Sequence, residues 1–349
     1  MKKIRLEGST PCEILIGKNL IQCSGEYINE VSAARQALII TDTVVNELYS
    51  SVLASSIMKK GIEVFLFVLD NGETSKCVQT VEKLYSFLIK NEFTRSDVII
   101  ALGGGVVGDV SGFVAATYMR GMDLVQIPTT LLSQIDSAIG GKNGVNLPHG
   151  KNLVGTTYQP KLVLNDLSAL ATMSPKLFSD GMAEAIKYGL IRSKELFYKI
   201  KNSNVKESLE DFIFECVSVK KDIIEADEHE KNERKLLNFG HSLGHAIERL
   251  YNFSGYTHGH AVAIGMAYAA RAGERLGITQ SGTYDEIIEV LKQYNLPFTI
   301  DCEINDLMAL AQRDKKSLGA YFDVVMIESI GKGFVKRIPT SELKKYIGG

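Results

Sequence analysis

The sequence feature that most constrains the fold is a repeated alternation of short, β-branched runs with helical stretches. ALIITD from residue 37 leads into a helical run to Lys60, IEVFLFVLDNGE into one to Lys90, and DVIIALGGG into one to Met119. Apolar runs that end in Gly or Asp and precede a helix are typical of βαβ units around a parallel sheet. The pattern therefore predicts a doubly wound, Rossmann-like α/β domain, and the alternating start MKKIRLEGSTPCEILIG predicts a further strand.

Polar or glycine-rich turns follow the predicted strands, at residues 41–42, 70–73 and 103–105. Ligands of parallel sheets bind at the carboxyl ends of the strands, so these turns are candidate binding segments. Residues 121–160 are rich in Gly, Thr, Asn and Lys without a clear period. We therefore expect an active-site loop there.

A different pattern begins beyond Pro175, where helical periodicity dominates to about Val290. A chain of 349 residues is long enough for about two domains. We predict an α/β domain over residues 1–175 and a mainly α-helical domain over residues 176–349, with a short strand over 323–328.

Charge and cysteine content narrow the range of partners and locations. With 39 basic and 41 acidic residues, the net charge of −2 disfavours nucleic acid and anionic membranes as partners. The five cysteines are scattered without a C-x-x-C pair, and the start of the chain lacks the apolar core of a signal peptide. These features predict a reducing, cytoplasmic location. Residues 98–119 are weakly polar, but three glycines and Asp109 argue against a membrane helix.

The glycine-rich turn GGGVVGD occupies residues 103–109, directly after a predicted strand. In that context the amides of a helix N-terminus bind a pyrophosphate, so the turn predicts dinucleotide binding. The turn follows at least the third strand and Asp109 comes immediately after it, so the register differs from the usual Rossmann fingerprint. A glycine turn that only lets a helix pack close to a strand is the alternative.

Four of the six histidines, at positions 241, 245, 258 and 260, fall within 20 residues. His241 and His245 are four apart and share one helix face, where they can present two ligands to a metal, or one ligand and one acid–base group. Any single histidine is more typical of a core or a cap, but the cluster favours a site.

Glu184 and Lys187 lie three apart on another predicted helix, where an exposed ion pair is the alternative to a functional role. One Glu with two His would make an open catalytic zinc site.

Basic residues near glycines, at positions 120, 142 and 151, predict anion recognition. Lys220 and Arg234 lie on a charged helix, where a solvated face is the default interpretation.

Taken in order, eight short strings resemble the 3-dehydroquinate synthases, the NAD- and metal-dependent sugar-phosphate cyclases of the shikimate pathway. The strings are NGETSK (71–76), GGGVVGD (103–109), RGMDLVQIPTTLLSQIDSAIGGK (120–142), HGKN (149–152), AEAIKYG (183–189), NFGHSLGHAIE (238–248), HGHAVAIGM (258–266) and DKK (314–316). The ordered set covers nearly the whole chain. The resemblance implies a dehydroquinate synthase-like fold, with an NAD-binding first domain and a metal- and substrate-binding second domain.

The resemblance also assigns roles to individual residues. It places the metal ligands at Glu184, His241 and His258. The implied NAD-binding residues are Asp42, Asn71, Gly72, Glu73, Lys76, Gly104, Gly105, Val106, Val107, Gly108, Asp109, Thr129, Thr130, Lys142, Lys151, Ala169, Leu170, Ala171 and Thr172. The implied catalytic residues are His245, Lys142, Lys187, Asn152 and Asp136. The implied substrate contacts are Lys220, Arg234, Asn238, one or both of Lys315 and Lys316, and Arg120 reaching the phosphate from a partner subunit of a homodimer.

The reaction that this resemblance implies starts from 3-deoxy-D-arabino-heptulosonate 7-phosphate. NAD oxidises a secondary alcohol, phosphate is eliminated, the hydride returns, and an intramolecular aldol reaction closes the ring of 3-dehydroquinate. The metal would polarise the alcohol, and its ligands suit zinc and also permit cobalt. The implied partners are one small-molecule sugar phosphate and a second subunit.

Four places depart from the family's usual residues: His260, Asn143, Thr157 and the segment 321–323. Related cyclases that act on other sugar phosphates retain the NAD and metal elements, so a 2-deoxy-scyllo-inosose synthase or an amino-dehydroquinate synthase is one alternative. A metal-dependent polyol or glycerol-phosphate dehydrogenase is another, and a non-catalytic nucleotide-binding or scaffold protein is a third. Arg234 with Lys220 suits a substrate carboxylate and favours the heptulosonate.

Overall fold

The computed structural model describes residues 1–148, 150–251, 255–302, 307 and 320–348. The chain forms two compact units. The first consists of Met1–Ser174 with Leu209–Lys221, and the second of Pro175–Ser208 with Asp222–Gly349. The domain ranges 1–175 and 176–349 stay a prediction, and the two units differ from them in that Leu209–Lys221 groups with the first.

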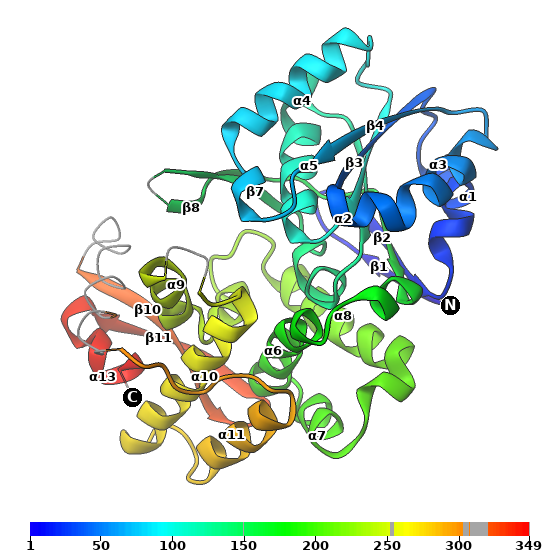
Figure 1. The fold of residues 1–349 in the computed structure, drawn as a ribbon. Coiled ribbons are helices and arrows are strands. Elements are labelled where there is room, and N and C mark those ends of the chain that lie inside the picture. The colour runs from blue at the N-terminus through cyan, green and yellow to red at the C-terminus, as the bar shows by residue number, and fades with distance from the viewer. Residues whose placement is uncertain (149, 252–254, 303–306, 308–319, 349) are drawn as a thin grey trace. The chain divides into compact units, whose positions relative to one another are not determined.

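A sheet forms the centre of the first unit (Figure 1). It has seven strands in the order β1-β2-β9-β6-β5-β3-β4. Every neighbouring pair is parallel except β1 and β2. The strands are β1 (Lys2–Leu6), β2 (Cys12–Gly17), β3 (Gln36–Asp42), β4 (Glu63–Leu69), β5 (Val98–Gly103), β6 (Asp123–Pro128) and β9 (Leu162–Asp166). The predicted doubly wound, Rossmann-like sheet is confirmed.

Two apolar clusters cover the faces of this sheet, because successive side chains of a strand point to opposite sides. Ile39 and Ile100 pack on one face with α1 (Leu20–Val31) and α3 (Ser51–Met58). Leu38 and Ile99 pack on the other face with α4 (Val78–Lys90) and α5 (Gly105–Thr117). The unit also contains α2 (Thr43–Val45), η1 (Asn46–Ser50), η2 (Glu73–Ser75), η3 (Tyr118–Arg120), η4 (Ser133–Ser137), η5 (Leu167–Thr172) and the first part of α8 (Leu209–Ala226).

The prediction of a loop over residues 121–160 is wrong, because much of this segment is strand. It contains β6 and the antiparallel hairpin of β7 (Lys142–Leu147) and β8 (Gly150–Thr157). β6 lies between β5 and β9 and is buried over most of its length, so its sequence has no alternating pattern. In the hairpin Gly144 lies opposite Gly155, and a Cβ on Gly144 would come within 2.7 Å of the Val154 carbonyl oxygen. These glycines serve close strand packing.

The second unit is mainly helical, as predicted. Its helices are α6 (Pro175–Ile191), α7 (Lys194–Asn202), η6 (Val205–Ser208), the end of α8, η7 (Glu233–Asn238), α9 (His241–Leu250), α10 (His258–Arg275), α11 (Thr283–Gln293), η8 (Thr340–Glu342) and α13 (Leu343–Ile347). Within the described part of the chain, no helix is long and apolar enough to cross a membrane.

One hairpin accompanies these helices. The short strand predicted over 323–328 is part of the longer β10 (Tyr321–Ser329), which pairs with β11 (Lys332–Pro339). The sequence does not indicate β11, because KGFVKRIP is basic and mostly half-buried or exposed. β10 contributes Val324 and Met326 to an apolar cluster with α9 and α10.

Candidate functional site

Most of the residues predicted to bind NAD follow the carboxyl ends of parallel strands of the first unit, whereas Lys142 and Lys151 lie on the antiparallel hairpin of β7 and β8. Asp42 ends β3, residues 71–76 follow β4, residues 104–109 follow β5, residues 129–130 follow β6, and residues 169–172 lie in η5 after β9. Because these strands are neighbours in one sheet, the turns share the edge at which such sheets bind ligands.

The glycine-rich turn joins β5 to α5, and Gly104 caps the helix. A Cβ on Gly108 would lie 2.8 Å from Gln126 Oε1, so close packing accounts for this glycine. A Cβ on Gly104 would meet the Thr130 methyl group at 3.5 Å, an ordinary contact distance. Packing therefore does not explain Gly104. The predicted approach of a pyrophosphate to the backbone amides at the start of α5 is consistent with a glycine at this position.

A charged cluster surrounds Asp109 in α5. The buried Lys76 ammonium forms an ion pair with Asp109. Glu73 Oε1 accepts a hydrogen bond from Asn146 Nδ2 at 2.8 Å and lies 3.6 Å from Lys151 Nζ. Burial raises the pKa of Asp109, and the opposing effect of Lys76 does not cancel it. The segment 71–76, α5 and the β7–β8 hairpin thus meet at one group of charges.

An open cavity of about 480 Å³ lies against the β7–β8 hairpin. Its lining includes three residues predicted to contact ligands, Asp109, Lys142 and Asn152. Asn152 has a φ of 55°, a left-handed conformation that asparagine adopts more readily than most residues. The cavity gives this unit a concave polar surface next to the charged cluster.

Two of the unusual residues lie on the same hairpin. Asn143 is buried, and its Nδ2 donates to the carbonyls of Gly141 at 2.7 Å and Tyr158 at 2.9 Å. Gly112 of α5 makes room for it, since a Cβ there would lie 1.9 Å from Asn143 Oδ1. Asn143 therefore links the two residues that flank the hairpin and packs against α5, whereas Thr157 is exposed at the end of β8.

Other predicted NAD residues support their own turns. Asp42 Oδ1 accepts two backbone amides of α2, at 2.9 and 3.1 Å. The hydroxyl of Thr130 lies 2.8 Å from that of Ser133, and the hydroxyl of Thr172 lies 2.7 Å from that of Tyr49. These contacts hold the strand-end turns in fixed conformations.

Lys220 and Asp136, both predicted to act on substrate, form a pair within the first unit. Lys220 Nζ donates to Asp136 Oδ1 at 2.7 Å and to the Asp136 carbonyl at 2.5 Å, and Lys220 is 5% exposed. Arg234, in the second unit, is 2% exposed. The default interpretation of a solvated helix face is therefore wrong for both basic residues, because Lys220 and Arg234 are each buried against hydrogen-bond acceptors.

Arg120, in contrast, is exposed, and its backbone has a φ of 66°.

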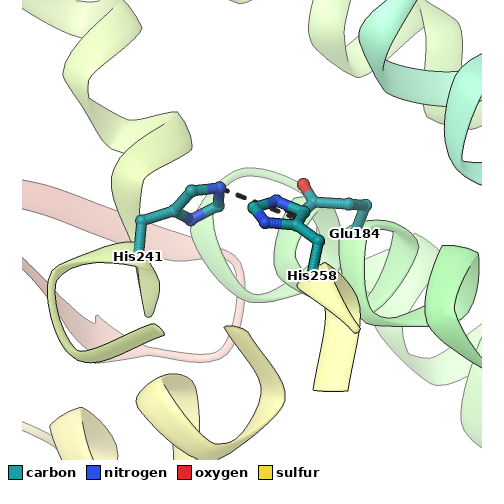
Figure 2. A group of neighbouring side chains, drawn as sticks. All are labelled: Glu184, His241 and His258. Carbon is teal, nitrogen blue, oxygen red and sulfur yellow. Dashed lines mark ion pairs between the residues drawn. The ribbon is translucent and has the colours of Figure 1, made fainter. Parts of the chain in front are cut away.

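The second unit brings Glu184, His241 and His258 together from three helices, α6, α9 and α10 (Figure 2). Glu184 Oε1 lies 3.8 Å from His241 Nε2 and 3.7 Å from His258 Nε2. One potential ligand atom from each residue lies within 4.8 Å of the others. Glycines allow this convergence, because a Cβ on Gly265 of α10 would lie 1.9 Å from the Gly240 carbonyl that precedes α9.

Glu184 and Lys187 form an ion pair, but both side chains are buried, at 0% and 1% exposure. The alternative of an exposed ion pair is therefore wrong. Glu184 Oε2 contacts the Lys187 ammonium, whereas Oε1, the oxygen that faces the two imidazoles, has no hydrogen-bond partner among the described residues. A buried carboxylate oxygen that faces two imidazoles and accepts no hydrogen bond fits a divalent metal, because one carboxylate and two imidazoles are the ligands of an open catalytic zinc site.

The protonation of the two imidazoles differs. Burial, followed by the charge of Lys187, holds the pKa of His241 well below its usual range, so this imidazole is neutral. Burial also opposes charging of His258, but a hydrogen bond to Glu248 and the charges of Glu248 and Glu184 outweigh it and raise the pKa of His258 to about 9. His258 therefore adds a positive charge next to the two carboxylates, in addition to the Lys187 ammonium beside Glu184.

His245, the predicted acid–base residue, is exposed on the same helix as His241, with ring centroids 5.4 Å apart. Sequence reasoning missed Glu248, whose Oε2 lies 3.5 Å from His258 Nδ1. Positions 241, 245 and 248 have the i, i+4, i+7 spacing of one helix face, so the sequence did contain a signal that Glu248 lies beside the two histidines.

The unusual His260 donates its backbone amide to Asp180, and its buried Nε2 has no hydrogen-bond partner among the described residues.

The loop after α8 leads into η7, which carries Arg234 and Asn238. Arg234 Nη1 donates to the Glu228 carbonyl at 2.6 Å, and Asn238 Nδ2 donates to Glu230 Oε1 at 2.7 Å. Asp227 holds the loop, because its carboxylate accepts three backbone amides, one of them from Arg234 at 3.2 Å. Burial alone would raise the pKa of Asp227, but these hydrogen bonds and the charge of Arg234 outweigh it and lower the pKa.

If Arg234 contacts the substrate, as the resemblance implies, Asp227→Ala should raise the KM at least about tenfold, because it removes the hydrogen bond that fixes the Arg234 backbone and hydrogen bonds to a charged group contribute about 1.5–3 kcal/mol each. Metal content should not change, because the hydrogen bonds of the Asp227 carboxylate in the described part of the chain go to the amides of residues 231, 232 and 234 and not to the Glu-His-His group. The lowered pKa means that the carboxylate stabilises the fold above its ordinary value of 3.8 and loses this effect as the pH falls through the folded value. Steady-state kinetics with metal analysis tests this, and an unchanged KM would contradict it.

The last unusual segment contacts η7. Asp323 Oδ2 lies 2.6 Å from Lys235 Nζ, next to Arg234 in the chain. Lys315 and Lys316, like His149 of the HGKN string, lie outside the described residues.

Two protein-family models and a curated relative match this chain over most of its length. The 3-dehydroquinate synthase N-terminal model matches residues 66–180, and the 3-dehydroquinate synthase C-terminal model matches residues 181–317. A 3-dehydroquinate synthase from Clostridium botulinum is 46% identical over 328 residues, covering 93% of this chain and 94% of that protein.

Two solved structures have the same fold. A 2-deoxy-scyllo-inosose synthase complexed with carbaglucose-6-phosphate, NAD+ and Co2+ has a TM-score of 0.88 and 26% identity, covering 99% of each chain. A 2-epi-5-epi-valiolone synthase from Streptomyces hygroscopicus with NAD+ and Zn2+ bound has a TM-score of 0.86 and 26% identity, covering 98% of this chain and 97% of that chain.

The fold and these matches define an enzyme of the cyclising lyase class. Within that class, the chain belongs to the 3-dehydroquinate synthase family.

Proposed function

We propose that the protein converts 3-deoxy-D-arabino-heptulosonate 7-phosphate to 3-dehydroquinate and phosphate, using NAD and a divalent metal. The observation that carries the proposal is the buried Glu184 Oε1 atom, which faces the Nε2 atoms of His241 and His258 and has no hydrogen-bond partner among the described residues. The family membership supports the reaction, and the NAD+ and Co2+ or Zn2+ of the two structural relatives support the cofactors.

Glu184, His241 and His258 would hold the metal, which would act as a Lewis acid that polarises substrate oxygens. The ligand set suits zinc and also permits cobalt. Lys187 lies beside Glu184, and its ammonium would bind an anionic group of the substrate. His245 is exposed near His241 and would accept or donate a proton.

NAD would bind at the carboxyl ends of β3, β4, β5, β6 and β9, and would serve as a hydride acceptor and donor that is recycled in each turnover. The start of α5 would bind the pyrophosphate. Lys151, held near Glu73, would add positive charge, and Lys142 would face a ligand in the adjoining cavity.

The remaining substrate contacts are proposed from the charges of the side chains. Arg234 and Lys220 would bind the carboxylate that distinguishes the heptulosonate from uncharged sugar rings. We further propose a cytoplasmic homodimer in which Arg120 reaches the substrate phosphate of the partner subunit. No observation favours another cyclase: the inosose and valiolone synthases are 26% identical to this chain, and the dehydroquinate synthase from Clostridium botulinum is 46% identical.

The redox balance of the reaction distinguishes the proposed cyclase from a dehydrogenase. The metal-loaded protein with NAD and the heptulosonate phosphate should release phosphate continuously while the absorbance of NADH stays constant. A polyol or glycerol-phosphate dehydrogenase would accumulate NADH in proportion to turnover. Phosphate release without NAD, or NADH accumulation without phosphate, would refute the proposed reaction.

Lys151→Ala is expected to weaken NAD binding about tenfold, the loss of roughly 1.4 kcal/mol from one charged contact. Metal content should equal that of the wild type. Fluorescence titration with NADH measures the affinity, and Lys161→Ala is a control on the same unit, because Lys161 pairs with Asp123. Equal NADH affinity in Lys151→Ala and wild type would remove Lys151 from the NAD site.

A further inference from the structure

The two nitrogens of His258 face two different carboxylates. Nε2 lies 3.7 Å from Glu184 Oε1, and Nδ1 lies 3.5 Å from Glu248 Oε2. The Glu248 side chain is 4% exposed. The imidazole is therefore aimed at Glu184 on one side and supported by a buried acid on the other.

The backbone that carries His258 is held by a third carboxylate. Asp180 Oδ1 accepts the amide of Gly259 at 2.6 Å and that of His260 at 3.3 Å, so it caps the first turn of α10. Asp180 is 6% exposed and lies one turn before Glu184 on α6. A Cβ on Gly259 would lie 2.0 Å from the Asp180 carbonyl oxygen, so the two helices are in contact at this point.

We propose that Glu248 and Asp180 are positioning residues for the metal ligand His258. Glu248 fixes the tautomer and the rotation of the ring, and Asp180 fixes the start of the helix that bears it. This inference rests on the proposed function, because it takes the Glu184–His241–His258 group as the metal centre.

The chemistry of a neutral imidazole explains the role of Glu248. If Nε2 binds the metal, the single ring proton must be on Nδ1, and a hydrogen-bond acceptor at Nδ1 selects that tautomer. His241 has the same arrangement, since its Nδ1 lies 3.1 Å from the Phe239 carbonyl oxygen. The two ligands therefore present the same nitrogen, but His258 has a charged acceptor, which also makes the ligand more basic.

The experiment measures metal affinity in the full-length protein. Zinc is titrated against a competing chelator for the wild type, Glu248→Ala and Glu248→Gln. We expect Glu248→Ala to bind zinc about 10- to 100-fold more weakly, with Glu248→Gln between the two because it keeps an acceptor but loses the charge. Saturating zinc should restore much of the activity of both variants, because no ligand to the metal is removed.

Matched variants test the specificity of the effect. Glu274→Gln removes another half-buried carboxylate of α10, which accepts the Tyr284 amide at 2.7 Å, and should leave zinc affinity unchanged. Asp180→Ala should weaken zinc binding, whereas Asp180→Asn, which keeps the accepting oxygen, should restore it. Equal zinc affinity in Glu248→Ala and wild type would overturn the inference for Glu248, and equal affinity in Asp180→Ala would overturn it for Asp180.

Further measurements use the wild-type protein, so their results do not depend on whether a variant folds. Nitrogen NMR of the zinc-loaded wild type should show the His258 proton on Nδ1, and a proton on Nε2 would overturn the inference. His245, Glu248 and His258 also bring potential ligand atoms within 4.8 Å of one another. Binding of two zinc ions per chain would make Glu248 a ligand and overturn its positioning role. A wild type that binds no metal would refute the proposed function itself.

Discussion

His241→Ala should abolish metal binding and lower the turnover of the heptulosonate phosphate by roughly 10³-fold or more, because a Lewis acid supplies several kcal/mol and each 1.36 kcal/mol is a factor of ten. NAD affinity should stay at the wild-type value, since the residues proposed to bind NAD belong to the first unit. Metal analysis, kinetics and NADH titration on the same preparation test all three statements.

His241 is a better choice than Glu184 for this test. Removal of Glu184 would leave the buried Lys187 ammonium without its ion-pair partner, and breaking a buried pair costs about 3–5 kcal/mol. A loss of activity in Glu184→Ala would therefore mix ligand loss with instability. His229→Ala, at an exposed histidine, is the matched control and should retain metal and activity. Wild-type metal content in His241→Ala would contradict the ligand assignment.

The second large effect concerns stability. We expect Lys76→Ala to lower the free energy of unfolding by about 3–5 kcal/mol, because it leaves Asp109 buried without its partner. The side chains of Lys76 and Asp109 are 7% and 17% exposed, so solvent can replace little of the lost interaction. Denaturant unfolding of the metal-free protein provides the measurement.

A double variant separates the effect of the Lys76–Asp109 pair on stability from its effect on NAD binding. Lys76→Met with Asp109→Asn removes both charges and should recover most of the stability, since a neutral pair often replaces a buried ion pair without loss. NAD binding should remain weak in this variant if the charges serve the cofactor. The exposed pair of Lys332 and Glu328 is the control, and Lys332→Ala should change stability by at most about 1 kcal/mol. A similar small change in Lys76→Ala would show that the Lys76–Asp109 pair contributes little.

The fold was predictable where one chemical pattern determines one element. β3, β4 and β5 are apolar runs that end at polar turns, and each precedes a helix, so their parallel arrangement follows from the sequence. β6 and β9 have no such pattern, because the short helices η4 and η5 follow them instead of a long helical run. The β7–β8 hairpin was missed because its glycines, which permit close strand contact, also indicate a loop.

The candidate metal centre was only partly predictable. The spacing of His241 and His245 placed them on one helix face, and the resemblance to a known family supplied Glu184 and His258. Spacing along a chain does not show that α6, α9 and α10 meet, because their contact depends on glycines such as Gly240 and Gly265. The burial of Lys220 and Arg234 could not be predicted either, since charged residues on a helix usually face solvent. The structure supplies these tertiary contacts and the additional carboxylates Asp180, Asp227 and Glu248.

The most direct test of the proposed function is a proton and phosphorus NMR time course. It would follow the metal-loaded protein with catalytic NAD and 3-deoxy-D-arabino-heptulosonate 7-phosphate. We predict equal release of phosphate and 3-dehydroquinate without net NADH. No reaction in a folded sample that binds both metal and NAD would contradict the proposed substrate, while leaving the fold and the family in place.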